Sequence, residues 1–125
     1  MENTDFLDLA IWLKELPDAK EVEFRSSISR SFTYLYNFLK EKFHHDLRIT
    51  FKKDDMDKRL LKDIFNQAGE YSLLKKWVLF CKDRNDAEYD ITAEEFIKED
   101  ADEYIEDLEA FIEEVKPMKV KKVGV

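Results

Sequence analysis

The sequence predicts an all-α protein, built as an antiparallel bundle of about five helices. Two glycines and two prolines in 125 residues favour long helices over turn-rich β structure. Apolar residues recur at three- and four-residue steps along most of the chain, which is the spacing of a buried helix face. Charged residues of both signs make up 40% of the chain, as expected for the outer faces of such helices. We therefore expect one helical-bundle domain at residues 1–116 and a flexible basic tail at 117–125.

The first third of the chain is expected to form two helices. Thr4 is a candidate N-terminal cap for the first helix, and Pro17 ends it. Asp18 and Glu21 have the spacing of a capping box for the second helix, which runs without Gly or Pro to about His44. This second helix is the longest element expected. Its apolar stripe comprises Val22, Phe24, Ile28, Phe32, Leu35, Leu39 and Phe43.

The middle of the chain is expected to contain a loop and two shorter helices. Residues 44–53 include a short alternation of apolar and polar side chains, but no clear partner strand follows, so we expect a loop. Asp54 or Asp55 is a candidate cap for the third helix, and Gly69 is its expected C-terminal stop. Ser72 is expected to begin the fourth helix. The apolar faces of these two helices comprise Leu60, Leu61, Ile64, Phe65, Ala68, Leu73, Leu74, Trp77, Val78, Phe80 and Cys81.

The last helix is expected to begin at Thr92, which forms a second candidate capping box with Glu95. Pro117 ends it. Residues 94–114 contain eleven acidic side chains and one lysine, so the acidity of the chain belongs to this segment. We interpret these acids as the solvated face of an amphipathic helix. The opposite, apolar face comprises Phe96, Ile97, Ala101, Ile105, Leu108, Phe111, Ile112 and Val115.

Composition argues against several classes of function. A formal net charge of −8 opposes unassisted binding of the whole molecule to nucleic acid, because that binding depends on neutralising phosphates. The two glycines, Gly69 and Gly124, cannot form a P-loop or a dinucleotide-binding loop. His44 and His45 are adjacent, and adjacent positions on a helix face different ways, so we expect no metal site and no cofactor.

The single cysteine, Cys81, excludes a disulfide within the chain and is consistent with a reducing compartment. It lies in an apolar run, so we interpret it as a buried structural thiol. The N-terminus lacks the basic and apolar regions of a signal peptide, and no apolar run reaches transmembrane length. We therefore expect a cytoplasmic protein.

A concentrated polar cluster follows the apolar face of the fourth helix. Arg84 offers a planar fork of donors suited to phosphate or carboxylate, and Asn85 and Tyr89 lie beside it in sequence. The alternative is that Arg84 pairs with an acidic neighbour and fixes the end of the helix. The cluster comprises Asp83, Arg84, Asn85, Glu88 and Tyr89.

Two segments of the chain resemble the HEPN superfamily of small helical domains. Residues 24–34, FRSSISRSFTY, are similar to the family's second-helix pattern of small residues, arginine and aromatic residues. Residues 84–90, RNDAEYD, resemble the Arg-x-x-Ala-Asp-Tyr-Asp signature of one HEPN group. The resemblance spans roughly residues 20–115 and implies an antiparallel bundle that commonly dimerises. Many members are metal-independent ribonucleases or toxins paired with a nucleotidyltransferase-type antitoxin, and others are non-catalytic partners.

The chain departs from the catalytic pattern of that family, in which a histidine follows the arginine after four to six residues. Arg84 matches the arginine, but the positions for the histidine hold Tyr89, Asp90 and Ile91. No histidine occurs after His45. Cleavage through a 2′-hydroxyl gains from a group that titrates near neutral pH, and tyrosine titrates near 10.

Three hypotheses follow from the residues and the resemblance together. The first is a homodimeric, non-catalytic subunit of a prokaryotic toxin–antitoxin or defence-type system, which binds a nucleotide, RNA or a partner protein of nucleotidyltransferase type. Its binding residues are Arg84, Asn85, Glu88 and Tyr89, with Arg30 nearby from the second helix. The second is a metal-independent ribonuclease that uses the same residues, with a degenerate form of the family's Arg-x4-6-His site. The third is a helical protein–protein interaction module without a ligand.

Overall fold

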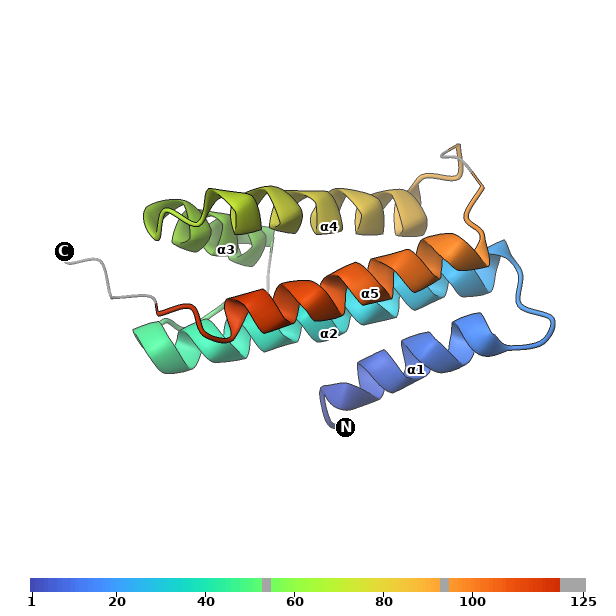
Figure 1. Cartoon of the computed structure of the whole chain (residues 1–125), viewed down its shortest axis with the longest axis horizontal. Helices are drawn as coiled ribbons and strands as arrows, with labels where there is room; N and C mark the ends of the chain where they lie inside the picture. Colours follow the sequence, from blue (N-terminus) through green and yellow to red (C-terminus); the bar gives the residue numbers. More distant parts are fainter. Residues whose placement is uncertain (53–54, 93–94, 120–125) are drawn as a thin grey trace.

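Five α-helices and no strand occur among the residues that the computed structural model describes, which are 1–52, 55–92 and 95–119. This confirms the all-α bundle predicted from apolar spacing. In Figure 1 the long helices lie roughly along one direction, with α1 and α4 on opposite sides of α2 and α5. The helices are α1 (Thr4–Glu15), α2 (Glu21–Leu47), α3 (Asp55–Gln67), α4 (Tyr71–Tyr89) and α5 (Lys98–Val115).

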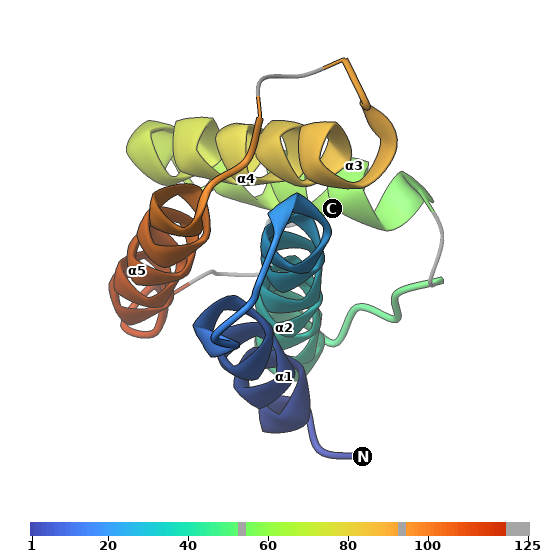
Figure 2. The same ribbon diagram turned by 90° about the vertical axis from the view of Figure 1, so that its right-hand side faces the viewer.

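Helix α2 is the central element, and it packs against α1, α4 and α5. Viewed along its axis in Figure 2, α2 lies between α1 and α4, with α5 beside it. It has 27 residues, which corresponds to about 40 Å at 1.5 Å per residue. Its buried positions recur every three or four residues, as expected for one face of a helix. They are Ser27, Ile28, Ser31, Phe32, Leu35, Leu39, Phe43 and Leu47.

A chain of aromatic rings joins α2, α3, α4 and α5 in the core. Phe43 contacts Phe65 at 5.7 Å between ring centroids, and Phe65 contacts Phe111 at 5.8 Å. Phe80 continues the chain, at 5.3 Å from Phe111 and 5.4 Å from Tyr104. All four contacts are edge-to-face, a geometry that adds about 0.5–1.5 kcal/mol per pair beyond the burial of area. The aromatic residues therefore fix how the four helices meet.

The first two helices begin at other residues than those predicted as caps. Thr4 lies inside α1, and Asn3 precedes the helix. The side chain of Asn3 donates to the carbonyl of Tyr34 instead of capping the helix, at 3.1 Å. The capping box expected at Asp18 was wrong, because α2 begins at Glu21 and the backbone amide of its N-cap residue donates to Glu23.

The last two helices also differ from the prediction at their ends. Thr92 does not begin α5. Its hydroxyl and amide donate to the carboxylate of Asp90 at 2.7 and 2.9 Å, which forms a turn. The helix begins at Lys98, after the amide of Ile97 has donated to Asp100 at 2.8 Å. Helix α4 begins one residue before Ser72, at Tyr71.

The loop and the breakers predicted in the middle of the chain have mixed outcomes. Helix α2 continues three residues beyond His44, and residues 48–52 form no regular structure. Gly69 stops α3 with a φ of 73°, a value that glycine adopts without strain, as predicted. Ala68 is exposed, contrary to its predicted place on the buried face, and Val78 is 43% exposed. Asp54 and the side chain of Asp55 lie outside the described residues.

The chain stays in contact with the core for three residues after α5. Helix α5 ends at Val115, but Met118 is also buried against the core. Residues 120–125 of the predicted tail lie outside the described residues. No helix among the described residues is long and apolar enough to span a membrane.

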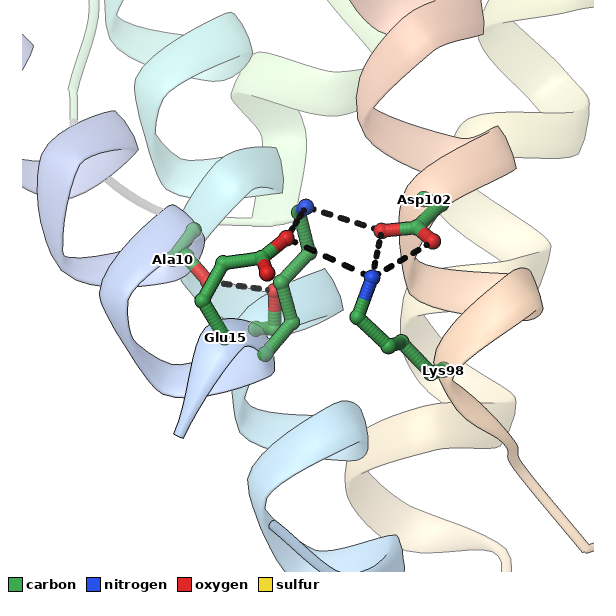
Figure 3. Close-up of polar contacts among 6 residues, drawn as sticks. Ala10, Glu15, Lys98 and Asp102 are labelled. Atoms are coloured by element: carbon green, nitrogen blue, oxygen red, sulfur yellow. Dashed lines mark hydrogen bonds and ion pairs between the residues drawn. The ribbon is translucent and has the colours of Figure 1, made fainter. Parts of the chain in front are cut away.

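A four-membered ion network ties the end of α1 to the start of α5. Lys14 contacts Glu15 at 2.7 Å and Asp102 at 2.8 Å, and Lys98 contacts the same two carboxylates at 3.4 and 3.1 Å. Figure 3 shows Glu15, Lys98 and Asp102 converging between the two helices. Hydrogen bonds from lysine hold the pKa values of both carboxyls below their usual range.

Candidate functional site

The polar cluster predicted from sequence lies on the last two turns of α4, because this helix continues to Tyr89. It was expected at the end of the fourth helix. In a helix, positions three and four apart share a face, so Arg84 and Glu88 lie together while Asn85 and Tyr89 lie beside them. This face of α4 meets α2, the helix that carries the other segment of the HEPN resemblance.

The guanidinium of Arg84 contacts residues that follow it on its own helix, and it packs on two aromatic rings. Its Nη2 atom is 2.8 Å from a carboxylate oxygen of Glu88, and its Nη1 atom is 3.4 Å from the amide oxygen of Asn85. The central guanidinium carbon is 5.5 Å from the ring centroid of Phe32 and 5.2 Å from that of Tyr89. The side chain is only 19% exposed. The alternative considered from sequence, pairing with an acidic neighbour, describes this contact.

The Nε atom of Arg84 is buried and has no hydrogen-bond partner among the described residues. A buried donor without a partner costs about 1–3 kcal/mol. The cation–π contacts and the pair with Glu88 offset this cost, and the rings hold the guanidinium in place. The side chain is therefore a fixed cation between α2 and α4, and it is not extended toward open solvent.

The carboxylate of Glu88 connects the two segments of the resemblance directly. Besides pairing with Arg84, it accepts a hydrogen bond of 2.7 Å from the hydroxyl of Ser29 on α2. A carboxylate that accepts from both a guanidinium and a hydroxyl is fixed in one orientation. The segment at 24–34 and the segment at 84–90 are thus joined by a side-chain hydrogen bond.

Arg25, which sequence reasoning did not select, makes the most extensive polar contacts in this region. Its Nη1 atom lies 2.9 Å from the carbonyl oxygen of Asp86, 3.1 Å from that of Ala87 and 2.9 Å from that of Asp90. These carbonyls lie at the C-terminal end of α4, where the helix dipole favours a cation. The guanidinium of Arg25 also packs over the ring of Phe96, whose centroid is 4.6 Å from the guanidinium carbon. The position of Arg25 inside the 24–34 segment was the feature of the sequence that could have marked it as a candidate.

A shallow hollow of about 220 Å³ lies between α2 and α4 beside Glu88. Arg30 is exposed at its edge, so the prediction that Arg30 lies near the cluster is consistent with this geometry. Arg84, Asn85 and Tyr89 do not line the hollow. The residues that line it are Val22, Arg25, Ser26, Ser29, Arg30, Ala87 and Glu88.

The two histidines do not contribute to this surface. His44 lies fifteen positions after Ser29 on the same helix, which places it about 22 Å away along the axis. Its Nδ1 atom is 2.7 Å from the carbonyl oxygen of Ile49, and the Nδ1 atom of His45 is 3.2 Å from a carboxylate oxygen of Asp46. Across the described ranges, no three His, Cys, Asp or Glu side chains are grouped to hold a metal ion.

Comparisons with known proteins identify no relative. No protein-family model matches the chain, and searches of curated proteins and of solved structures find no match. The arrangement of α2 and α4 is therefore the observation from which a function is argued.

Proposed function

We propose that this protein is a HEPN-like binding subunit without ribonuclease activity. The sequence resemblance implies a place in a prokaryotic toxin–antitoxin or defence-type system, beside a nucleotidyltransferase-type partner. The five-helix bundle is compatible with that family. In this role the surface formed by α2 and α4 binds the ligand or partner.

The observation that carries the proposal is the contact between the two resembling segments. Ser29 and Glu88 are 59 positions apart in sequence, yet Ser29 donates to Glu88 at 2.7 Å, and Arg25 contacts three carbonyls of the 84–90 segment. A chance match of two short patterns has no reason to place both on one surface. The contact between the two segments favours the interpretation that they serve one function together.

The chemistry of this surface suits a single-stranded RNA or a nucleotide. Arg30 is exposed and makes no ion pair with any residue that the structure describes, so its guanidinium can contact a phosphate. Tyr89 is 67% exposed, and aromatic rings of this kind stack on bases without regard to sequence. Arg84 packs on the ring of Tyr89 and pairs with Glu88, which lines the hollow. Asn85 is exposed on the same part of α4.

We propose no catalysis because this surface lacks a histidine that could transfer a proton near neutral pH. Arg84 could stabilise phosphate charge, but it is already paired with Glu88. The histidines lie far along α2, and the positions where catalytic members of the resembled family carry histidine hold Tyr89, Asp90 and Ile91. A binding role needs no such group.

Dimerisation is part of the proposal, because exposed apolar side chains flank the surface. Val22 is 65% exposed at the hollow, and Ile91 is 92% exposed after the end of α4. A second copy that covered them would bring two such surfaces together. Sedimentation of the wild type and of a Val22→Glu variant tests this part, and a monomeric wild type would contradict it.

A binding experiment tests the central claim. A fluorescein-labelled, single-stranded RNA is titrated with the wild-type protein at 50 and 150 mM salt, with and without EDTA. We expect Arg30→Ala and Tyr89→Ala each to weaken binding about tenfold, because a stacked base contributes about 1–3 kcal/mol. Arg59→Ala is the matched control, since Arg59 is an exposed arginine on α3. We expect it to change binding less than about twofold.

Two results would contradict the proposal. Cleavage of the RNA that persists in EDTA and is lost in Arg84→Ala would favour the ribonuclease hypothesis. No binding of RNA or nucleotide by the wild type would favour the interaction module without a ligand.

A further inference from the structure

A groove of about 500 Å³ runs between α4 and α5, on another face of α4 than the one that carries Arg84. Figure 1 shows these two helices running in opposite directions, and they contact each other. One wall is a stripe on α4 at Lys76, Leu79, Phe80 and Asp83. The other wall follows α5 from Asp100 to Glu114, and the fourteen steps between these residues correspond to about 21 Å.

The floor of the groove is apolar. Phe80 and Phe111 lie below, and Leu79 reaches the opening with 57% of its surface exposed. Ala110 adds a small side chain on the α5 wall, which leaves room in the groove. A large exposed leucine above two aromatic rings is the arrangement that an apolar ligand surface covers.

The rim of the groove is acidic and largely unpaired. Asp83, Glu103 and Asp107 make no hydrogen bond or ion pair within the described ranges. Of the other groove carboxylates, Glu114 pairs with Lys76 at 3.0 Å. The three unpaired carboxylates come from both walls, so a cationic ligand between the helices would meet them from two sides.

The electrostatic cost at Asp83 supports the same interpretation. Asp83 is exposed at the rim, but neighbouring groups remove part of its hydration and so raise the pKa of its carboxyl above its ordinary value; Lys82 opposes this effect and Asp86 adds to it. A carboxylate that has lost part of its hydration without gaining a cation is destabilised in its charged form. A basic side chain bound beside it would remove that cost.

We propose that the groove between α4 and α5 binds an amphipathic, basic helix of a partner protein. The basic side chains of that helix pair with Asp83, Glu103 and Asp107, and its apolar face covers Leu79 and the rings of the floor. A helix of about 14 residues matches the length of the groove. This inference concerns a surface separate from the one proposed to bind RNA and does not depend on it.

The charge of the groove excludes other occupants. Nucleic acid and anionic lipid surfaces carry negative charge and would be repelled by the acidic walls. A second copy of this chain would bring its own α5 face, from a segment with eleven acids and one lysine, toward the same acids. A basic partner of different sequence is the occupant that complements both the floor and the rim.

The test uses a synthetic peptide of about 14 residues, made of leucine and lysine with leucines at helical spacing. Binding to the full chain is measured by fluorescence anisotropy at 150 mM salt. A peptide of the same composition in scrambled order and a peptide with glutamate in place of lysine serve as ligand controls. We expect only the amphipathic basic peptide to bind with saturation.

Matched variants separate the groove from general charge. Glu103→Gln with Asp107→Asn removes two charges from the groove, and Glu106→Gln with Glu109→Gln removes two from the other side of α5. We expect the groove variant to weaken binding about fivefold to tenfold and the control less than about twofold. Leu79→Ala should weaken binding without changing charge, and circular dichroism confirms that each variant is folded.

Several outcomes would overturn the inference. Equal weakening by the two charge variants would show general attraction to an acidic protein, and equal binding of the scrambled peptide would show the same. Absence of saturable binding would remove the site. A dimer of the wild type that the groove variant dissociates would assign the groove to a second copy of the chain.

Discussion

The guanidinium of Arg25 donates a hydrogen bond of 2.9 Å to the backbone carbonyl of Asp90, which lies 65 residues later in the chain. Two further carbonyls at the end of α4 lie within 3.1 Å of the same nitrogen. The last carbonyls of a helix lack partners within it, and a cation there also interacts favourably with the helix dipole. This one side chain on α2 therefore holds the end of α4 in place and positions the segment that contains Arg84.

Replacement of Arg25 should destabilise the fold. We expect Arg25→Ala to lower the free energy of unfolding by about 2–4 kcal/mol, because the carbonyls lose a charged donor and Glu21, 2.8 Å from Nε, loses its partner. Arg25→Lys should recover only part of this, since an ammonium lacks the planar fork that reaches several acceptors. Urea denaturation followed by Trp fluorescence measures both.

The control for this prediction is Arg59→Ala, which removes an exposed arginine from α3 and should change stability by less than about 0.5 kcal/mol. If Arg25→Ala were no more destabilising than this control, the contact between Arg25 and the end of α4 would contribute nothing to the fold.

Apolar spacing predicted the helices well because burial decides where a helix lies. Phe32 and Trp77, for example, were placed on buried faces from sequence, and their rings stack with centroids 5.6 Å apart. Capping was predicted poorly because short polar side chains have competing partners. Thr92 bonds to Asp90 rather than to a helix, and Asn3 bonds to a distant carbonyl. Such choices depend on contacts that only the folded chain creates.

The candidate site, too, could be predicted from the sequence only in part. Sequence placed Arg84, Asn85, Glu88 and Tyr89 together because they share a short segment, and they do lie on neighbouring faces of α4. It did not decide whether Arg84 faces a ligand or its neighbour Glu88, since that depends on the rings of α2 beneath it. The role of Arg25 could not be predicted because its partners are backbone carbonyls that lie 61 to 65 residues later in the chain.

The pair between Arg84 and Glu88 should show measurable coupling. We expect a double-mutant cycle of Arg84→Gln and Glu88→Gln to give a coupling energy of about 0.2–1 kcal/mol, the range for partly exposed pairs. The coupling should fall in 1 M salt. Thermal or urea unfolding of the four proteins measures it. A coupling indistinguishable from zero at low salt would mean that the guanidinium spends its time away from Glu88.

Cys81 should react slowly in the native protein. Burial raises the pKa of its thiol to about 11, so less than about one part in a hundred is thiolate at pH 8. In urea the thiol returns to its ordinary pKa near 8.5 and gains access to reagent. We expect alkylation by iodoacetamide, followed by mass spectrometry, to be at least about tenfold slower in the native state. Equal rates in the two conditions would contradict the burial of this thiol.

The ion network between α1 and α5 should make stability depend on acid pH. Hydrogen bonds from Lys14 lower the pKa of Asp102 and of Glu15 in the folded protein. A carboxyl with a lowered folded pKa stabilises the protein above its unfolded pKa, near 4, and loses that contribution as pH falls through the folded value. We therefore expect the melting temperature to fall between pH 5 and pH 2, as these carboxylates bind protons.

The variant Asp102→Asn tests the share of this network in that fall. It removes the carboxylate that both Lys14 and Lys98 contact, so it should lower the melting temperature at pH 7 and flatten the decline below pH 4. Glu99→Gln, an exposed acid one turn away with no ion pair among the described residues, is the matched control and should leave the profile unchanged. Parallel profiles for Asp102→Asn and the wild type would mean that other carboxylates govern acid unfolding. The difference should also shrink in 0.5 M salt, because the network is partly exposed and salt screens such pairs.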